Sequence, residues 1–437
     1  MGRTPPGVVC ERVGVTTAAV SFAGLVLAYA LTARRLGRLN VSAPLVFVVA
    51  GTVLGLLGHA RTGEQVVWVR VVADVTLALV LFHDAAQVRP ADLRAVGPLV
   101  ARLLLLAWPL TLLAGFVVGR AFFPEQPVML TLLVAAALAP TDAGLGAAVL
   151  MNRVVPVRVR ALLNVESGVN DGLATPVVLF AIVALAGEES LRPVVSAAEA
   201  FMALGLGGVI GLVVGVFGGR VLAWSRRAGA STASARTLGV FTLPVLAFGG
   251  AEVAGSNGFV AAFVAGAAFG ASARWVEEEE SAFGLTEASA ELLGFGVWLI
   301  FGLVVVPQLW GSIGWREVVY AALSLTVLRM VPVVLSLVGS GLRWRTMLFL
   351  GWFGPRGLAT VVFTLLAIET LEVDETLRHA LLAVSLTVLF SVVAHGATAQ
   401  PLAERYGRWS RRQEPSIEAG SAREPRPRGT LATKGRP

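Results

Sequence analysis

Apolar runs of about twenty residues follow one another along most of the chain, and they limit its fold more than any other feature. A helical run of that length crosses a hydrocarbon core about 30 Å thick. Of the 437 residues, 56% are hydrophobic and 14% are charged, whereas a soluble domain has about a quarter of its residues charged. The period-two alternation of an outer-membrane barrel does not run through the sequence. The sequence therefore predicts an all-α polytopic membrane protein.

We expect about 13 transmembrane helices, with boundaries uncertain by a few residues. The expected spans are 15–33, 43–58, 66–86, 97–119, 127–150, 157–186, 193–223, 237–254, 257–273, 286–306, 318–340, 346–368 and 376–400. The eighth and ninth spans are alternatively one broken hairpin.

The arginines favour one orientation in the membrane. They stand at the ends of apolar segments, unlike the clustered basic and aromatic residues of a nucleic-acid-binding domain, so we expect no nucleic-acid partner. With an external N-terminus, the cytoplasmic loops are the ones rich in arginine, beginning with Arg34 and Arg38. We therefore expect a multi-pass protein of the cell inner (plasma) membrane. It would have a short external N-terminus (1–14), a transmembrane domain (15–402) and a disordered cytoplasmic tail (403–437).

One span carries several polar side chains together. The stretch 164–176, NVESGVNDGLATP, contains Glu166, Ser167, Asn170 and Asp171. On a helix these side chains form two neighbouring ridges, since each of the first two is four residues from one of the last two. A carboxylate at membrane depth is costly and marks a functional site by default. Asp171 is the strongest candidate, because an arginine that pairs with Glu166 cannot easily satisfy it as well.

Two other spans combine proline and glycine with a charge in mid-span. ALAPTDAGLG carries Asp142 in the fifth span, and FGPRG carries Arg356 in the twelfth. These are matching positions of two halves if the seventh span is a linker. Interrupted helices at such positions point to the binding site of a transporter built from inverted repeats. We expect the two broken helices to cross, with Asp142 and Arg356 neutralising their ends.

Each of these charges also has a structural explanation. Asp142 caps a half-helix, contacts an ion directly, or does both. Arg356 either pairs with Glu166 or compensates helix ends, because buried charges are paired. Arg329 is a second structural arginine or snorkels to the interface. His395 is a pH sensor or a polar cap.

Three more carboxylates, Glu252, Glu287 and Glu291, are candidates to line the same cavity, with placement at a helix end as the default for the latter two. The acidic run 277–280 is expected in a solvated loop. The single cysteine, Cys10, excludes an internal disulfide.

Several motifs together resemble the sodium/proton exchanger family, the monovalent cation:proton antiporters of the electroneutral bacterial branch. They are APTDAGLG, VPVRVRALLNVESGVNDG, FGPRG and AHGATAQPL, and the likeness spans roughly residues 15–402. It implies two inverted repeats with crossed interrupted helices, and a core domain that moves against a dimerisation domain in a homodimer. It also implies exchange of an alkali cation for a proton, one for one.

The same resemblance implies a set of site residues. Asp171 is the shared cation and proton site, and Na⁺ is coordinated by Asp171, Ser167 and Thr141. The further residues around the ion are Glu166 and Asp142, and those that organise the site are Asn170 and Arg356. Oxygen ligands of this kind suit a hard cation. No resident cofactor is expected, and exchange becomes obligatory if one carboxylate binds either ligand but never both.

Other functions remain open at this stage. Within transport, Li⁺ is a second candidate ion, and a potassium/proton exchanger or an organic-anion carrier on the same fold is the nearest alternative. A membrane-embedded hydrolase is disfavoured, because the chain has neither an HExxH motif nor a recognisable pair of catalytic aspartates. A receptor or channel with a structural polar core is the remaining alternative. We therefore expect a transporter rather than an enzyme.

Overall fold

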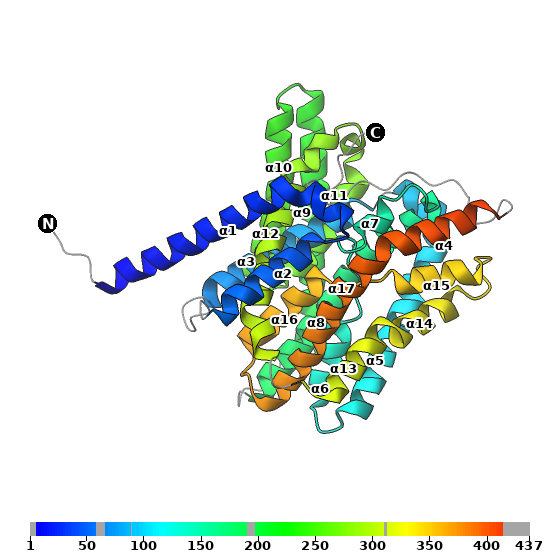
Figure 1. The fold of residues 1–437 in the computed structure, drawn as a ribbon. Helices are drawn as coiled ribbons and strands as arrows, with labels where there is room; N and C mark the ends of the chain where they lie inside the picture. The colour runs from blue at the N-terminus through cyan, green and yellow to red at the C-terminus, as the bar shows by residue number, and fades with distance from the viewer. Residues whose placement is uncertain (1–5, 58–65, 89, 190–196, 310–312, 414–437) are drawn as a thin grey trace.

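The computed structural model describes residues 6–57, 66–88, 90–189, 197–309 and 313–413 (Figure 1). In the first half of this part the helices are α1 (Pro6–Arg38), α2 (Ala43–Leu56), α3 (Val66–Ala86), α4 (Pro90–Arg102), the π-helical turn η1 (Leu103–Ala107), α5 (Trp108–Phe122), α6 (Val128–Ala137), α7 (Ala147–Leu150), α8 (Val157–Glu189) and α9 (Ala197–Arg227). In the second half they are α10 (Ala233–Val253), α11 (Gly258–Ser272), the short turns η2 (Arg274–Glu277) and η3 (Glu280–Phe283), α12 (Gly284–Ile300), η4 (Phe301–Val305), η5 (Val306–Leu309), α13 (Trp315–Leu325), α14 (Val327–Leu337), α15 (Trp344–Trp352), α16 (Leu358–Thr370) and α17 (Glu375–Arg411).

Every predicted span has a helical counterpart. The described residues contain thirteen helical segments if α4 is counted with α5, α6 with α7, α12 with η4, α13 with α14, and α15 with α16. The uncertain region at 237–273 is two helices, α10 and α11, and the Asn257 side chain caps the second by accepting from Val260 N at 2.9 Å. Seven helices among the described residues are long and apolar enough to cross a bilayer, and α2, α6, α11 and α16 are shorter apolar helices. The protein is a multi-pass membrane protein.

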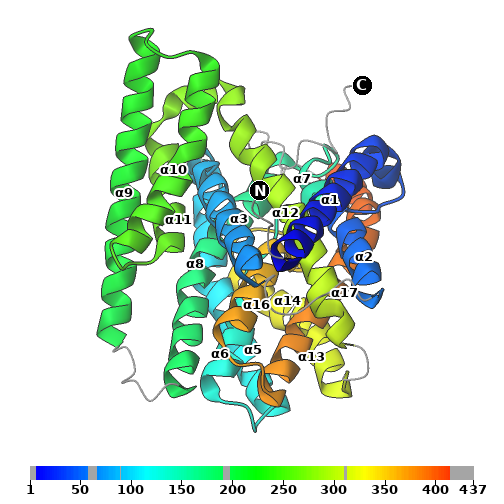
Figure 2. The same ribbon diagram turned by 90° about the vertical axis from the view of Figure 1, so that its left-hand side faces the viewer.

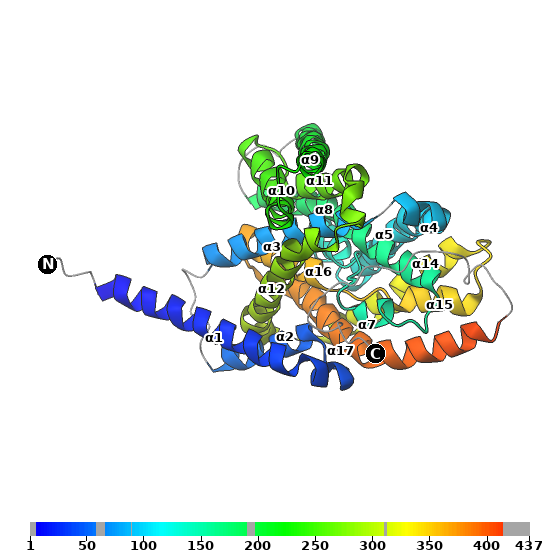
Figure 3. The same cartoon turned by 90° about the horizontal axis from the view of Figure 1, so that it is seen from above.

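α3 and α12 lie between two sets of helices, and a further set lies beside them (Figure 3). Seen from above, α9, α10 and α11 lie along one edge and α1 and α2 along the opposite edge, with α3 and α12 between them (Figure 3). The helices α4, α5, α14 and α15 lie to one side of all of these (Figure 3). Figure 2 shows α9, α10 and α11 standing together as one upright layer. Phe47 of α2 stacks on Phe295 of α12 with ring centroids 4.5 Å apart, and Tyr29 of α1 contacts both rings.

The fifth and twelfth segments are both interrupted, as predicted. The chain leaves helical geometry between α6 and α7 and again between α15 and α16. Pro140 and Pro355 lie within the two breaks, where each removes a backbone donor that a continuous helix would need. The two breaks cross, because Asp142 N donates to the Pro355 carbonyl at 2.8 Å. The remaining free backbone groups therefore need partners from elsewhere in the fold.

Both ends of the membrane domain differ from the prediction. α17 continues to Arg411, so a disordered tail that begins at Ala403 is wrong for residues 403–411. Ala403 and Tyr406 are buried there, and Tyr406 stacks on Phe349 with centroids 4.1 Å apart. At the other end α1 begins at Pro6, within the segment expected to precede the first span. The rest of the predicted tail, residues 414–437, lies outside the described residues.

Candidate functional site

The crossed breaks exchange charges between their helix ends. Arg356 is fully buried, and its Nη1 donates to the Pro140 carbonyl at 3.2 Å, beyond the end of α6. In return, Asp142 Oδ2 accepts from Leu358 N at 2.6 Å, at the start of α16. A helix carries negative partial charge at its C-terminal end and positive partial charge at its N-terminal end, so each side chain compensates the break opposite. This is the structural alternative expected for both residues, and Arg356 compensates helix ends instead of pairing with Glu166.

Two glycines of the FGPRG motif make this approach possible. A Cβ on Gly357 would overlap the Asp142 carboxylate, and a Cβ on Gly354 would overlap the guanidinium of Arg329. Both groups are charged and fixed by hydrogen bonds, so neither can move aside cheaply. The motif therefore supplies room for two charged side chains in addition to the helix break.

Glu166 pairs with Arg329 and not with Arg356, the partner that one of the two alternatives for Arg356 proposed. Arg329 Nη2 lies 2.5 Å from Glu166 Oε1, and the two side chains are 1% and 2% exposed. Arg329 is thus a structural arginine in the core and does not snorkel to the interface. Because a buried charge without its partner is strongly unfavourable, this pair ties α14 to α8.

The polar face of α8 meets the first break. Thr141 Oγ1 lies 3.0 Å from Ser167 Oγ, and Asn170 Nδ2 donates to Thr141 Oγ1 at 2.7 Å. All three residues are at most 5% exposed, and Asp171, one helical turn beyond Ser167, is 6% exposed. Two hydroxyls, an amide and a carboxylate from two elements therefore converge on one small region.

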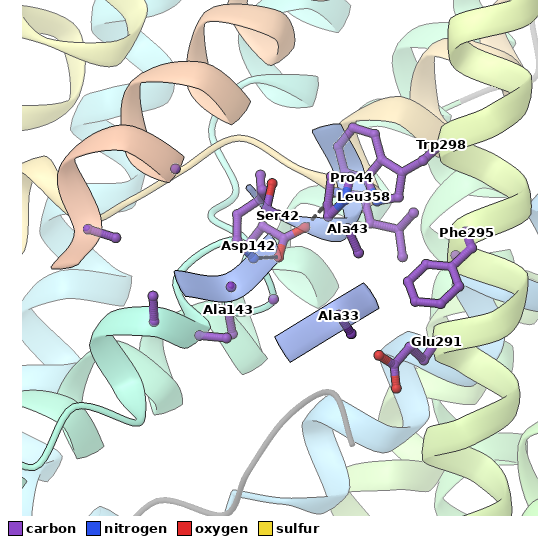
Figure 4. Close-up of a pocket in the computed structure, with 18 of the residues that line it drawn as sticks. Ala33, Ser42, Ala43, Pro44, Asp142, Ala143, Glu291, Phe295, Trp298 and Leu358 are labelled. Atoms are coloured by element: carbon purple, nitrogen blue, oxygen red, sulfur yellow. Dashed lines mark hydrogen bonds between the residues drawn. The ribbon is translucent and has the colours of Figure 1, made fainter. Parts of the chain in front are cut away.

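A cavity of about 820 Å³ reaches this region, and both Asp171 and Asp142 line it. Figure 4 shows Asp142 in its wall beside Leu358, with Glu291 of α12 on another part of the wall. The other acidic residues that line it are Asp84 and Glu287. Of the helices that line the cavity, α1, α2, α12 and α3 pack in succession and form one wall, and α7 and α16 both pack against α17 and form the other; α8, which carries Asp171, lines it too. Arg34 and Arg38 also line the cavity, but the five carboxylates outnumber them, so a small hydrated cation could approach Asp171 through this cavity.

The comparison with known proteins agrees with this geometry. Residues 22–405 match the protein family described as "Sodium/hydrogen exchanger, transmembrane". The chain belongs to the sodium/hydrogen exchanger family. Within it, a Na⁺/H⁺ antiporter of Schizosaccharomyces pombe is 26% identical over 369 residues, which cover 75% of each chain.

Two further known proteins are similar to this chain. A probable Na⁺/H⁺ antiporter of the same yeast is 26% identical over 328 residues, which cover 70% of this chain but 42% of the relative. The chain therefore spans less than half of that relative's length. The sodium proton antiporter MjNhaP1 from Methanocaldococcus jannaschii has a TM-score of 0.72 at 18% identity, and the match covers 89% of this chain and 98% of that chain. This exchanger-family chain thus shares the MjNhaP1 fold.

Several polar residues of this exchanger-family chain have roles that the sequence left open or missed. Glu287 lies in the first turn of α12, which was the default expectation, and both Glu287 and Glu291 line the cavity. Glu252 instead accepts from Gly258 N at 3.1 Å, at the start of α11. His395 is the predicted polar cap, because its Nε2 lies 2.8 Å from the Trp352 carbonyl at the end of α15. Asp84 was not singled out from the sequence. Its place in the last turn of an apolar span was the available signal.

Proposed function

We propose that this chain is a secondary active transporter that exchanges Na⁺ for H⁺ across the membrane by alternating access. The observation that carries the proposal is the position of Asp171, a carboxylate of α8 that lines the cavity beside two crossed helix breaks. Family membership supports it, as do the names of the two yeast relatives, one a Na⁺/H⁺ antiporter and the other a probable Na⁺/H⁺ antiporter.

In this mechanism one carboxylate serves two ligands in turn. Asp171 holds either a proton or a dehydrated Na⁺, and Ser167 and Thr141 supply further oxygen ligands. Asn170 fixes the Thr141 hydroxyl by its hydrogen bond, while Asp142 keeps negative charge at the crossing. Since hard alkali cations prefer oxygen ligands, this donor set suits Na⁺. The core crosses only when Asp171 is loaded, so the two ions are coupled by competition.

The expected stoichiometry is one for one. Asn170 stands next to Asp171 where a second aspartate would add another titratable charge. Of the other two carboxylates at the site, Glu166 pairs with Arg329 and Asp142 accepts from two backbone N–H groups. A single carboxylate that carries one Na⁺ in one direction and one H⁺ in the other moves no net charge. Exchange should therefore be insensitive to an imposed membrane potential, and a rate that changes with a potassium-diffusion potential would contradict this stoichiometry.

The proposed setting is the plasma membrane, with the N-terminus external and the C-terminus cytoplasmic. The support is the arginine distribution, since Arg34, Arg38, Arg343 and Arg345 follow or precede spans on one side. We also propose a homodimer, by family resemblance. Cross-linking of the protein in native membranes tests the dimer, and a product that runs only as the monomer would argue against it.

Proton flux in proteoliposomes tests the function. Vesicles with an acid interior are given Na⁺, Li⁺ or K⁺ separately, and the collapse of the pH gradient is followed with an internal dye. Wild-type protein should collapse the gradient with Na⁺, and Asp171→Asn should not. Glu404→Gln is the matched control, because it makes a similar charge change on a half-exposed residue of α17, and it should behave as wild type.

The alternatives give different results. A response to K⁺ alone would replace Na⁺ by K⁺ as the transported ion, and a response to Li⁺ with Na⁺ would widen the substrate range. A response to Na⁺ that survives in Asp171→Asn would show that the carboxylate is misassigned. No cation-dependent response in wild type would reject exchange altogether.

A further inference from the structure

A second group of charges joins helices of the two cavity walls, at the ends of those helices that lie away from the cavity. α3 carries Asp84 at the cavity and Arg70 fourteen residues earlier, which is about 20 Å along a helix. α16 carries Leu358 at the cavity and Glu369 eleven residues later, or about 16 Å. Arg70 and Glu369 therefore lie beyond the cavity on the far side of the site.

At that end the two helices are bridged by an arginine. Arg70 Nη1 lies 3.2 Å from Glu369 Oε1 of α16, and Arg70 Nε lies 3.5 Å from Asp74 Oδ2 of its own helix. The arginine is 59% exposed, but the two carboxylates are only 16% and 17% exposed. The exposed arginine thus pairs with two carboxylates that are mostly buried.

The charges around Arg70 are unbalanced. Two carboxylates, Asp74 and Glu369, share this one arginine and interact electrostatically with each other, and Asp74 also interacts with Glu252 of α10. Without Arg70, the carboxylates of α3 and α16 would repel each other. Loss of the arginine would therefore do more than remove an attraction, since it would push the two helices apart.

We propose that Arg70, Asp74 and Glu369 form a latch that holds the far side closed while the cavity is open, and that sets the balance between the two states of the exchanger. The inference rests on the proposed alternating access, in which the walls that part at one side must close at the other. α3 belongs to the wall with α12, and α16 to the wall with α7 and α17, so the latch bridges the two bodies that must separate on this side.

The chain offers a matched control. Arg316 Nη1 lies 3.3 Å from Glu125 Oε1, and this distance is close to that of the Arg70–Glu369 pair. The Arg316–Glu125 pair joins α13 to the segment between α5 and α6, and α13 and α5 also pack against each other. None of α5, α6 and α13 lines the cavity, so this pair does not bridge the two cavity walls, and breaking it should leave the balance unchanged.

Thiol labelling measures the balance between the two states of the exchanger directly. All variants carry Cys10→Ser, which removes the native thiol. Ala73 of α3, one turn from Arg70, is 1% exposed, so an A73C thiol should react with a soluble maleimide only when the far side opens. Ala148 of α7 lines the cavity and is exposed, so an A148C thiol reports the cavity side. Purified protein in lipid nanodiscs presents both faces to the reagent.

Each substitution has a definite expectation. An exposed ion pair contributes little free energy, so the expected change is small. Arg70→Gln should raise the rate of A73C labelling about two- to fivefold without raising that of A148C. Glu369→Gln should raise A73C labelling by a smaller factor, because it removes attraction and repulsion together. Arg316→Gln should leave both rates unchanged. A general loosening of the fold would differ, since it would raise both labelling rates.

The latch is overturned if Arg70→Gln and Glu369→Gln both label A73C at the Arg316→Gln rate. Should Arg70→Gln fail to fold, Glu369→Gln and the control decide between the same outcomes. Exchange by the same preparations is measured in parallel. Wild-type protein without exchange would reject the proposed function, whereas normal exchange with unaltered labelling would reject the latch alone.

Discussion

Replacing Gly357 by alanine should disrupt the crossing of the two broken helices. A Cβ there would overlap the Asp142 carboxylate, whose oxygens accept from Leu358 N at 2.6 Å and from Leu145 N at 2.9 Å. A hydrogen bond to a charged group contributes about 1.5–3 kcal/mol net. The substitution should therefore lower the free energy of unfolding by that amount if only the Leu358 bond is lost. The loss should be about twice as large if both bonds break.

Thermal unfolding of the detergent-solubilised protein measures this loss, with Gly97→Ala as the control. A Cβ on Gly97 in α4 meets no atom within 4 Å, and alanine in a helix is favoured over glycine by about 0.5–1 kcal/mol. The control should therefore unfold at or above the wild-type midpoint, and Gly357→Ala well below it.

A double-mutant cycle identifies the cause. In an Asp142→Gly background both the carboxylate and the Cβ that the new methyl group would overlap are gone, so adding Gly357→Ala should cost much less than it does in wild type, and the two effects should be strongly non-additive. Additive losses, or a Gly357→Ala midpoint equal to that of Gly97→Ala, would refute the account of why glycine occupies this position.

Three further substitutions test other contacts. Arg329→Gln should destabilise the protein by about 3–5 kcal/mol, because it leaves Glu166 buried without its partner; adding Glu166→Gln should recover part of the loss in the same melting assay, and no recovery would argue against the pair. Asn170→Ala removes the donor to Thr141 and should raise the half-saturating Na⁺ concentration of exchange, whereas an unchanged value would mean that the amide does not organise the site. Tyr406→Phe removes a buried hydrogen bond and should lower the unfolding free energy by about 1 kcal/mol; a loss near zero would indicate that this part of α17 is held by ring stacking alone.

The sequence contained most of the information about the membrane helices. Their lengths and order follow from apolar runs, and the two breaks follow from proline and glycine beside a charge, because these patterns are local. The polar ridge of α8 was predictable for the same reason. A helix places side chains four residues apart on one face whatever surrounds it.

Pairings between distant segments were not predictable in the same way. Arg329 and Glu166 are separated by 163 residues, and the sequence offered Arg356 as an equally good partner. Only the packing of α14 against the core decides between the two arginines. The end of α17 was missed for a related reason. Its last turns are rich in arginine and look like a solvated tail, but Ala403 and Tyr406 are buried against neighbouring elements.

Calorimetry of cation binding tests the central claim, that Asp171 serves both ions, most directly. Na⁺ is titrated into the purified protein in two buffers with different ionisation enthalpies, which yields the number of protons released for each cation bound. At a pH where the carboxylate is protonated, the account predicts that each bound Na⁺ displaces one proton, and that Asp171→Asn releases none. Sodium binding without proton release in wild type, or release that persists in Asp171→Asn, would contradict it.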